Sequence, residues 1–316
     1  MPALVSSAAI AAAAARIEGV ARHTPLVELP VEVGGPVYAK CENLQAGGAF
    51  KIRGAYNFIA RLDGAVAGPG VITYSSGNHA QAVALAARRR GLAAVVVMPT
   101  TAPAVKVEGA RRLGAEVHFE GTTSIDRKRR AEALAEERGY TMVPPFDHPD
   151  IVAGQGTVGL EILKDCPEFS RVLVPVGGGG LVAGIATAVK SVRPDVTVVG
   201  VEPSGAPKMS ESLAVGHPVT LDQVSSIADG LIPVRPGYLT FAHVRRYVDE
   251  VVTVDDASIA AATRWYADRA KLVVETSGAV TLAALQSGAV PTGDGVTVAV
   301  VSGGNVSLDT LHSLPD

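Results

Sequence analysis

The sequence contains little of several residue types that would point to particular classes of protein. Only two cysteines occur among 316 residues, and Cys41 and Cys166 are far apart, so neither a disulfide framework nor a zinc site is predicted. Aromatic residues make up 4% of the chain, and 28 Lys and Arg stand against 31 Asp and Glu. Without stacking rings or an excess of positive charge, nucleic-acid binding is not expected. No apolar run reaches the roughly 18 residues of a membrane span, so no membrane partner is expected either.

The alanine-rich segment 1–15 is the one stretch that resembles a signal peptide. It has no basic residue at its start, and Ser6 and Ser7 precede the main alanine run as N-caps do. A first helix is therefore predicted there, and a cytoplasmic location is expected.

Glycine and small apolar residues, by contrast, are abundant. The 34 glycines in 316 residues are about 11%, against a usual level of roughly 7%. The hydrophobic fraction of 47% excludes a disordered chain, and the length exceeds what one core usually sustains. Two domains, or one large α/β unit, are expected.

Short Val-rich runs alternate with helical segments, which predicts βαβ units and parallel sheets flanked by helices. The predicted strands are 71–74, 94–98, 116–119, 141–143, 172–176, 197–201 and 296–301. The predicted helices are 78–90, 103–113, 125–138, 181–192, 258–271 and 278–286. Gly91, Gly114 and Gly139 follow three of these helices, where a left-handed C-cap favours glycine.

A proline-rich break at 144–149 divides this series. We predict a larger domain made of residues 1–69 and 148–316, with a smaller α/β domain, residues 70–147, inserted into it.

Four segments stand out because glycine and small polar residues gather in them at strand ends, where open α/β sheets bind ligands. They are 47–55 (GGAFKIRGA), 75–82 (SSGNHAQA), 175–181 (PVGGGGL) and 301–306 (VSGGNV). The four consecutive glycines let backbone N–H groups converge on an anion at a helix N-terminus, and the absence of a lysine there excludes a P-loop. A phosphate monoester fits best, and a tight turn for close packing is the alternative.

Single residues in the other three segments allow two interpretations. Lys51 is flanked by Phe50 and Ile52, so its ammonium is expected to be partly desolvated, with a lowered pKa and the capacity to act as a Schiff-base nucleophile. The alternative is a buried, ion-paired lysine. Likewise, the two serines of SSGN either cap a helix or contact a ligand, and His79 is either packed or functional.

In this order and spacing, the four segments resemble the fold-type II pyridoxal-phosphate enzymes, and within them the threonine/serine dehydratases and serine racemases. The segments 40–45 (KCENLQ), 153–157 (AGQGT) and 227–230 (IADG) agree with this resemblance. The implied fold is the tryptophan synthase β-like α/β fold: two domains with open twisted parallel sheets flanked by helices.

The resemblance implies roles for individual residues. Lys51 would form the Schiff base with pyridoxal phosphate and later move the Cα proton of the substrate, and Ser76 occupies the position of the acid or base on the opposite face in the racemases. Cofactor contacts are implied for Lys51, Phe50, Asn78, Gly177, Gly178, Gly179, Gly180, Leu181, Glu275 and Ser302. Substrate contacts are implied for Ser75, Ser76, Gly77, Asn78 and His79.

The activity implied is β-elimination from L-threonine, L-serine or a related β-hydroxy amino acid, giving a 2-oxo acid and ammonia, by a homodimer or homotetramer. The stretches 235–241 and 247–252 resemble the dehydratases more than the animal racemases, and amino-acid racemisation is the alternative. A noncatalytic binder of the cofactor or of an amino acid is a more distant reading. A nicotinamide-dependent oxidoreductase is disfavoured because the four glycines lack dinucleotide spacing.

The resemblance breaks down at 201–208. Metal-activated relatives carry an acidic residue six positions after the glutamate and a carbonyl four positions after it; here these positions are Lys208 and Ala206, after Glu202. No metal is therefore expected, because two oxygen donors beside a cation make a poor Mg²⁺ or Ca²⁺ site. We hypothesise that the Lys208 ammonium replaces the metal by pairing with Glu202; the alternative is a solvent-exposed Lys208.

Overall fold

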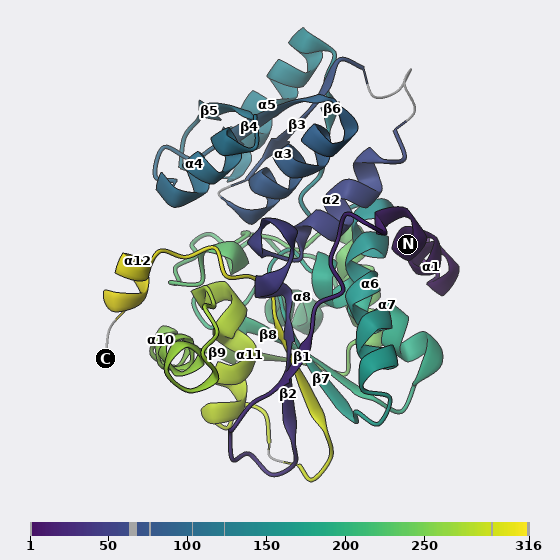
Figure 1. The fold of residues 1–316 in the computed structure, drawn as a ribbon, viewed down its shortest axis with the longest axis vertical. Helices are drawn as coiled ribbons and strands as arrows, with labels where there is room; N and C mark the ends of the chain where they lie inside the picture. The colour runs from purple at the N-terminus through teal and green to yellow at the C-terminus, as the bar shows by residue number, and fades with distance from the viewer. Residues whose placement is uncertain are drawn as a thin grey trace.

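The computed structural model describes residues 2–62, 68–75, 77–102, 104–122, 124–291 and 293–314. Figure 1 shows two groups of strands, one above the other, with helix α2 (Lys51–Ile59) at their junction. Ser76 and Pro103, the latter the expected start of a helix, lie outside the described residues.

The larger sheet has six strands in the order β1-β2-β10-β7-β8-β9. Their bounds are β1 Leu26–Glu28, β2 Val37–Cys41, β7 Arg171–Pro175, β8 Thr197–Pro203, β9 Glu250–Val254 and β10 Thr297–Val301. All neighbours are parallel except β1 and β2, which pair antiparallel with Leu26 opposite Lys40. The predicted parallel α/β class is confirmed, with one antiparallel strand at the edge of this sheet.

The smaller sheet has four strands, all parallel, in the order β5-β4-β3-β6. Their bounds are β3 Gly70–Tyr74, β4 Ala93–Met98, β5 Glu116–Phe119 and β6 Thr141–Met142. The helices α3 (Asn78–Arg90), α4 (Ala104–Arg112) and α5 (Ser124–Arg138) connect them and flank the sheet. The residues after these helices, Gly91, Gly114 and Gly139, have φ values of 69°, 91° and 65°, so each ends its helix in the left-handed conformation that favours glycine.

Further helices surround the larger sheet. They are α1 Ser7–Ile17, α6 Pro149–Asp165, α7 Gly180–Val192, α8 Lys208–Val215, α9 Tyr238–Tyr247, α10 Asp256–Trp265, α11 Thr276–Gln286 and α12 Leu308–His312. Three short 3-10 turns are η1 Glu42–Leu44, η2 Ala46–Gly48 and η3 Asp229–Leu231. Within the described part of the chain, no helix is long and apolar enough to cross a membrane.

Glycine permits close contact between α6 and α7. A Cβ on Gly184 of α7 would lie 2.5 Å from the backbone nitrogen of Gly156 and from the carbonyl of Val152, both on α6. Larger residues would push the helices apart, so part of the glycine excess serves packing rather than ligand binding.

Helix α2 contributes to the core of the smaller sheet. Ile52, Ala55 and Ile59 pack in one cluster with Val83 of α3 and Val96 of β4. The sequence-based division assigns α2 to the larger domain, and those domain boundaries stay a prediction.

The predicted elements agree with the observed ones to within one or two residues in most cases. The segment 258–271 differs: α10 ends at Trp265, a π-helical turn spans Tyr266–Ala270, and Lys271 has a φ of 57°. At the N-terminus, Ser6 is the N-cap of α1, its hydroxyl accepting from the N–H of Ala9, and Ser7 is already helical.

Candidate active site

Three of the four glycine-rich segments meet where strands of both sheets end. The backbone N–H of Phe50 donates to the carbonyl of Ser302 over 3.1 Å. Asn305 Nδ2, after β10, donates to Asn78 Oδ1 at the start of α3 over 2.9 Å. The lysine segment, the SSGN segment and the loop after β10 therefore border one site between the two sheets.

Lys51 is the first residue of α2 and reaches across this site. Its Nζ donates to the carbonyl of Pro145 over 2.9 Å and lies 5.2 Å from the ring centroid of Phe50. Burial lowers the pKa of Lys51 to about 8, and the Pro145 carbonyl carries no charge that would raise it again. The ion-paired alternative is therefore not what the structure shows: the amine of Lys51 lies beside a neutral carbonyl, and its lowered pKa makes it easier to deprotonate than an ordinary lysine.

The fourth segment, the glycine loop, lies next to Phe146, the residue that follows Pro145. The ring of Phe146 covers the loop so closely that a Cβ on Gly178 would lie 2.3 Å from it. Gly179 has a φ of 94° and is the N-cap of α7, and no cap side chain accepts a hydrogen bond there. The first backbone N–H groups of α7 are thus left for an anion, and the Gly178 carbonyl accepts a hydrogen bond from Thr240 Oγ1 over 2.7 Å.

The SSGN segment begins α3 in the same way. Gly77 is the N-cap and offers no side chain, and its own N–H donates to Ser75 Oγ over 3.2 Å. His79 is buried, with Nε2 3.3 Å from the carbonyl of Val143. Burial lowers the pKa of His79 to about 3, so it is a neutral, packed imidazole at neutral pH. Ser76, the predicted second acid or base, lies outside the described residues.

Glu275 faces Asn78 at the N-terminus of α11. Asn78 Nδ2 donates to Glu275 Oε1 over 2.5 Å, and Oε2 has no hydrogen-bond partner among the described residues. Burial raises the pKa of Glu275 to about 7. The hydroxyl of Ser302 donates to the carbonyl of Ser277 over 3.3 Å, so it too is buried in this site.

Lys106 is a site residue that the sequence analysis did not single out. It extends from α4, its Nζ lies 2.5 Å from Asp229 Oδ2 and 3.8 Å from Glu275 Oε2, and it joins the smaller sheet to the larger part. Burial would lower the pKa of Lys106, but Glu275 and Asp229 raise it overall. The available signal was its rarity: it is one of eight lysines, and it lies in the first turn of α4.

Behind Lys51, a network of buried charges anchors α2. Arg53 makes two hydrogen bonds to Glu42, of 2.7 and 2.8 Å, and two to Glu161, of 2.7 and 2.9 Å. Lys40 Nζ lies 2.6 Å from Glu161 Oε2. Burial would lower the pKa of Arg53, but the carboxylates of Glu42 and Glu161 raise it overall.

This network explains two segments that had no individual roles in the sequence analysis. KCENLQ supplies Lys40 and Glu42, and AGQGT supplies Gln155, whose Oε1 accepts from the N–H of Gly54 over 3.2 Å. These residues hold the helix that begins at Lys51, and so they act on the site through its position.

The predicted pairing of Lys208 with Glu202 is wrong. Both side chains are buried, which also excludes a solvent-exposed Lys208. Lys208 Nζ donates to three backbone carbonyls, whereas Glu202 accepts from the N–H of Met209 at 3.0 Å, and the two form no ion pair in the part of the chain that the structure describes. The physical reason is that nearby main-chain groups satisfy each charge separately. Over the described ranges, no group of three His, Cys, Asp or Glu is placed to hold a metal ion.

The arrangement fits pyridoxal phosphate. A helix N-terminus without a side-chain cap suits a phosphate group, a desolvated lysine suits an aldehyde, and the buried hydroxyl of Ser302 and the half-buried amide of Asn78 are polar groups that suit a ring. The individual assignments of Lys51, Phe50, Asn78, Leu181, Glu275, Ser302 and the four glycines to the cofactor stay predictions, as do the substrate contacts predicted for Ser75, Gly77, Asn78 and His79.

Comparison with known proteins supports the same reading. The family model described as "Pyridoxal-phosphate dependent enzyme" matches residues 17–303. An L-threonine ammonia-lyase from Geobacter sulfurreducens is 46% identical over 280 residues, which cover 89% of this chain and 70% of that protein. An L-threo-3-hydroxyaspartate ammonia-lyase from Pseudomonas is 41% identical, with 96% of each chain covered. The structure of maize serine racemase superposes with a TM-score of 0.94 at 39% identity, covering 98% of this chain and 96% of that one.

Proposed function

The chain belongs to the pyridoxal-phosphate-dependent enzyme family, and on this premise we propose that it is a threonine/serine ammonia-lyase. The observation that carries the proposal is Lys51: a desolvated amine with a lowered pKa, next to a glycine loop that leaves a helix N-terminus open to an anion. Its substrate would be L-threonine, L-serine or a related β-hydroxy amino acid.

Binding of the cofactor would use the chain's own groups as follows. Lys51 would hold it at Nζ, and the N–H groups of Gly177 to Leu181 would hold its phosphate at the start of α7. Ser302 would face the pyridine nitrogen, and a neutral hydroxyl there leaves that nitrogen largely unprotonated.

When bound, pyridoxal phosphate supplies an electron sink that acidifies the Cα–H of the substrate. Lys51, released when the substrate amine takes its place on the cofactor, would take that proton, which requires a neutral amine and is favoured by its lowered pKa. The N-terminus of α3 would hold the substrate carboxylate, because its N–H groups and helix dipole attract an anion. Loss of the β-hydroxyl as water leaves an enamine, which tautomerises and is hydrolysed to a 2-oxo acid and ammonia.

Racemisation of serine or another amino acid is the second candidate, and the likeness to maize serine racemase favours it. Both activities begin with removal of the Cα proton by Lys51. They differ in the next step, since racemisation returns a proton on the opposite face and elimination expels the β-substituent.

The test is an assay of the purified protein with L-threonine, L-serine and L-threo-3-hydroxyaspartate, following 2-oxo acid release and the appearance of D-isomers. We expect a visible cofactor absorption band and faster oxo-acid release than racemisation from at least one substrate. Faster formation of D-amino acid would assign the protein to the racemases. A bound cofactor without either product would make it a binding protein.

We also propose that the protein acts in the cytoplasm as a homodimer or homotetramer. Its two cysteines, Cys41 and Cys166, are buried free thiols, as in proteins of a reducing compartment. Light scattering measures the oligomeric state, and a monomer at all concentrations would contradict this part of the proposal.

A further inference from the structure

Lys208 carries a charge that the proposed reaction does not use. It is the first residue of α8, and its side chain is fully buried. Its Nζ donates to the carbonyls of Val176 at 3.0 Å, Ala206 at 3.0 Å and Leu231 at 2.9 Å. An ammonium group has three N–H donors and a neutral amine has two, so three carbonyl acceptors require the charged form.

The three carbonyls come from segments that are distant in sequence but border the site. Val176 immediately precedes the glycine loop. Leu231 ends η3, the turn that carries Asp229, the ion-pair partner of Lys106. One ammonium thus ties the base of the glycine loop to the segment that contacts the smaller sheet.

The surroundings are those of a cation site. Three carbonyl oxygens converge on one point, and burial lowers the pKa of Lys208 to about 8, a fall that the buried carboxylate of Glu202 limits, so the ammonium form predominates at neutral pH. Oxygen donors of this kind are what Ca²⁺ and Mg²⁺ use in proteins. Here the chain fills the position with its own side chain.

We propose that the Lys208 ammonium is a built-in cation that positions the glycine loop and the Asp229 segment, so that no metal ion is needed at this place. It is a positioning residue, because it acts through main-chain carbonyls. The part of the proposal that concerns cofactor affinity rests on the proposed function, and the part that concerns cation binding does not.

The first experiment compares the full-length protein with its Lys208→Ala variant. We expect chelation with EDTA to leave the thermal midpoint and the cofactor affinity of the unsubstituted protein unchanged. In Lys208→Ala, the dissociation constant for pyridoxal phosphate should rise about tenfold or more, which corresponds to the loss of one hydrogen bond from a charged donor.

The matched control is Arg171→Ala, which removes a cation at the start of β7, the end of that strand away from the glycine loop, where it donates to the carbonyl of Pro291 and to Thr297 Oγ1. This variant should lose thermal stability with little change in cofactor affinity. A Lys208→Ala variant that behaves like Arg171→Ala, or cofactor loss from the unsubstituted protein on chelation that Mg²⁺ restores, would overturn the proposal.

Lys208→Asp keeps the inference testable even if Lys208→Ala does not fold. A carboxylate at this place, with Glu202 and the three carbonyls, should create a site for a divalent cation. We expect Ca²⁺ to raise its thermal midpoint and EDTA to reverse the rise, with no such response in the unsubstituted protein. No response of Lys208→Asp to Ca²⁺ or Mg²⁺ would refute the cation-site reading. Because this readout is stability, it stands even if no ammonia-lyase activity is found.

Discussion

Two sets of buried charges lie on opposite sides of α2, and they differ in how completely they are paired. Behind the helix, Arg53 makes four hydrogen bonds to two carboxylates. In the site, Lys51 has a neutral carbonyl as its partner, and one oxygen of Glu275 has no hydrogen-bond partner among the described residues. Both sets consist of basic and acidic side chains, but the charges of the first set are fully paired with one another and those of the second set are not.

The difference shows in the pKa values. At Arg53 the neighbouring carboxylates outweigh burial, and the pKa is raised overall. At Lys51 and Glu275 burial outweighs the neighbouring charges: it lowers the pKa of Lys51 and raises the pKa of Glu275. Paired charges hold one arrangement of the chain, and incompletely paired ones titrate near neutral pH, where proton transfer is useful. This suggests that the first set positions the lysine and the second set performs the chemistry.

The most severe way to test the comparison is Lys51→Ala. We expect turnover to fall by about 10⁴-fold or more, the upper end of what a positioned proton-transfer group contributes, and the visible cofactor band to disappear. Stability should change little, because a neutral carbonyl loses its partner. Absorbance spectroscopy, steady-state kinetics and urea unfolding measure the three effects, with the exposed Lys128→Ala as control. Full activity in Lys51→Ala would remove the basis for the distinction.

Substitution of Arg53 should have the opposite profile. Arg53→Met leaves Glu42 and Glu161 without their main cation, so we expect the free energy of unfolding to fall by about 3–5 kcal/mol. Urea unfolding measures this loss, and the absorption maximum of the bound cofactor in the folded fraction should be unchanged. A loss below about 1 kcal/mol would mean that the network does not anchor α2.

Glu275→Gln tests whether the site carries an incompletely compensated charge, since Lys106 Nζ lies 3.8 Å from Glu275 Oε2 and makes no hydrogen bond to it. An acid whose pKa is about 7 in the folded state, against 4.5 in the unfolded chain, binds more protons when folded between these values. The free energy of unfolding contributed by Glu275 therefore falls as pH rises from 4.5 to 7, by about 3 kcal/mol, and is level above that range. Glu275→Gln should remove this fall, so its stability should depend less on pH.

The control for this prediction is Glu116→Gln. Hydrogen bonding to Arg138 lowers the pKa of Glu116 to about 2, so its titration lies below the range in question. Urea unfolding between pH 5 and 8 should give the same slope for Glu116→Gln as for the unsubstituted protein. An equally unchanged slope for Glu275→Gln would show that Glu275 ionises normally.

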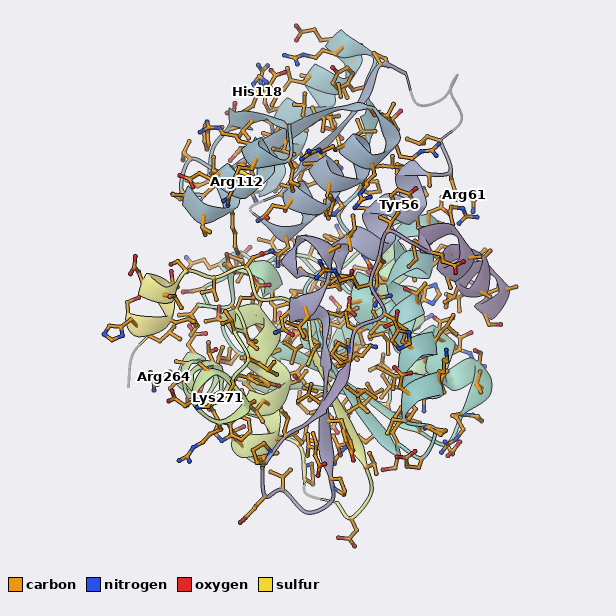
Figure 2. All side chains as sticks on the ribbon, viewed as in Figure 1. Tyr56, Arg61, Arg112, His118, Arg264 and Lys271 are labelled. Atoms are coloured by element: carbon orange, nitrogen blue, oxygen red, sulfur yellow. The ribbon has the colours of Figure 1, made fainter. Side chains whose placement is uncertain are left out.

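The smallest effect is expected at Arg61, which lies just beyond α2 and points outward in Figure 2. It is 53% exposed and lies 2.9 Å from Asp150, whereas Arg53 is 1% exposed. Arg61→Met should change the free energy of unfolding by less than about 1 kcal/mol, since solvent weakens such pairs. A loss as large as that of Arg53→Met would show that burial is not what separates the two arginines.

Much of the local structure was predictable because it depends on short stretches of chain. Val-rich runs and helical segments alternate along the sequence, and Gly91, Gly114 and Gly139 mark helix ends because only glycine adopts a positive φ at little cost. The π-helical turn at Tyr266–Ala270 was missed, since nothing in its composition distinguishes it from the helix before it.

The partners of charged side chains were much less predictable. Lys106 was overlooked, and Lys208 was assigned to the wrong partner. Asp229, the partner of Lys106, is 123 residues away from it in the sequence. Two of the backbone carbonyls that accept from Lys208, those of Val176 and Leu231, are 32 and 23 residues away from it. Sequence carries no direct signal for where a distant main-chain carbonyl will point.

By itself, the sequence determined the parallel α/β architecture, the family and the lysine and glycine segments that define the candidate site, because these follow from local periodicity and ordered motifs. Only the tertiary structure decided which buried charges are compensated. Burial and long-range packing set that balance: they surround Arg53 with carboxylates, leave Lys51 facing a neutral carbonyl, and place the Lys208 ammonium where three carbonyls converge.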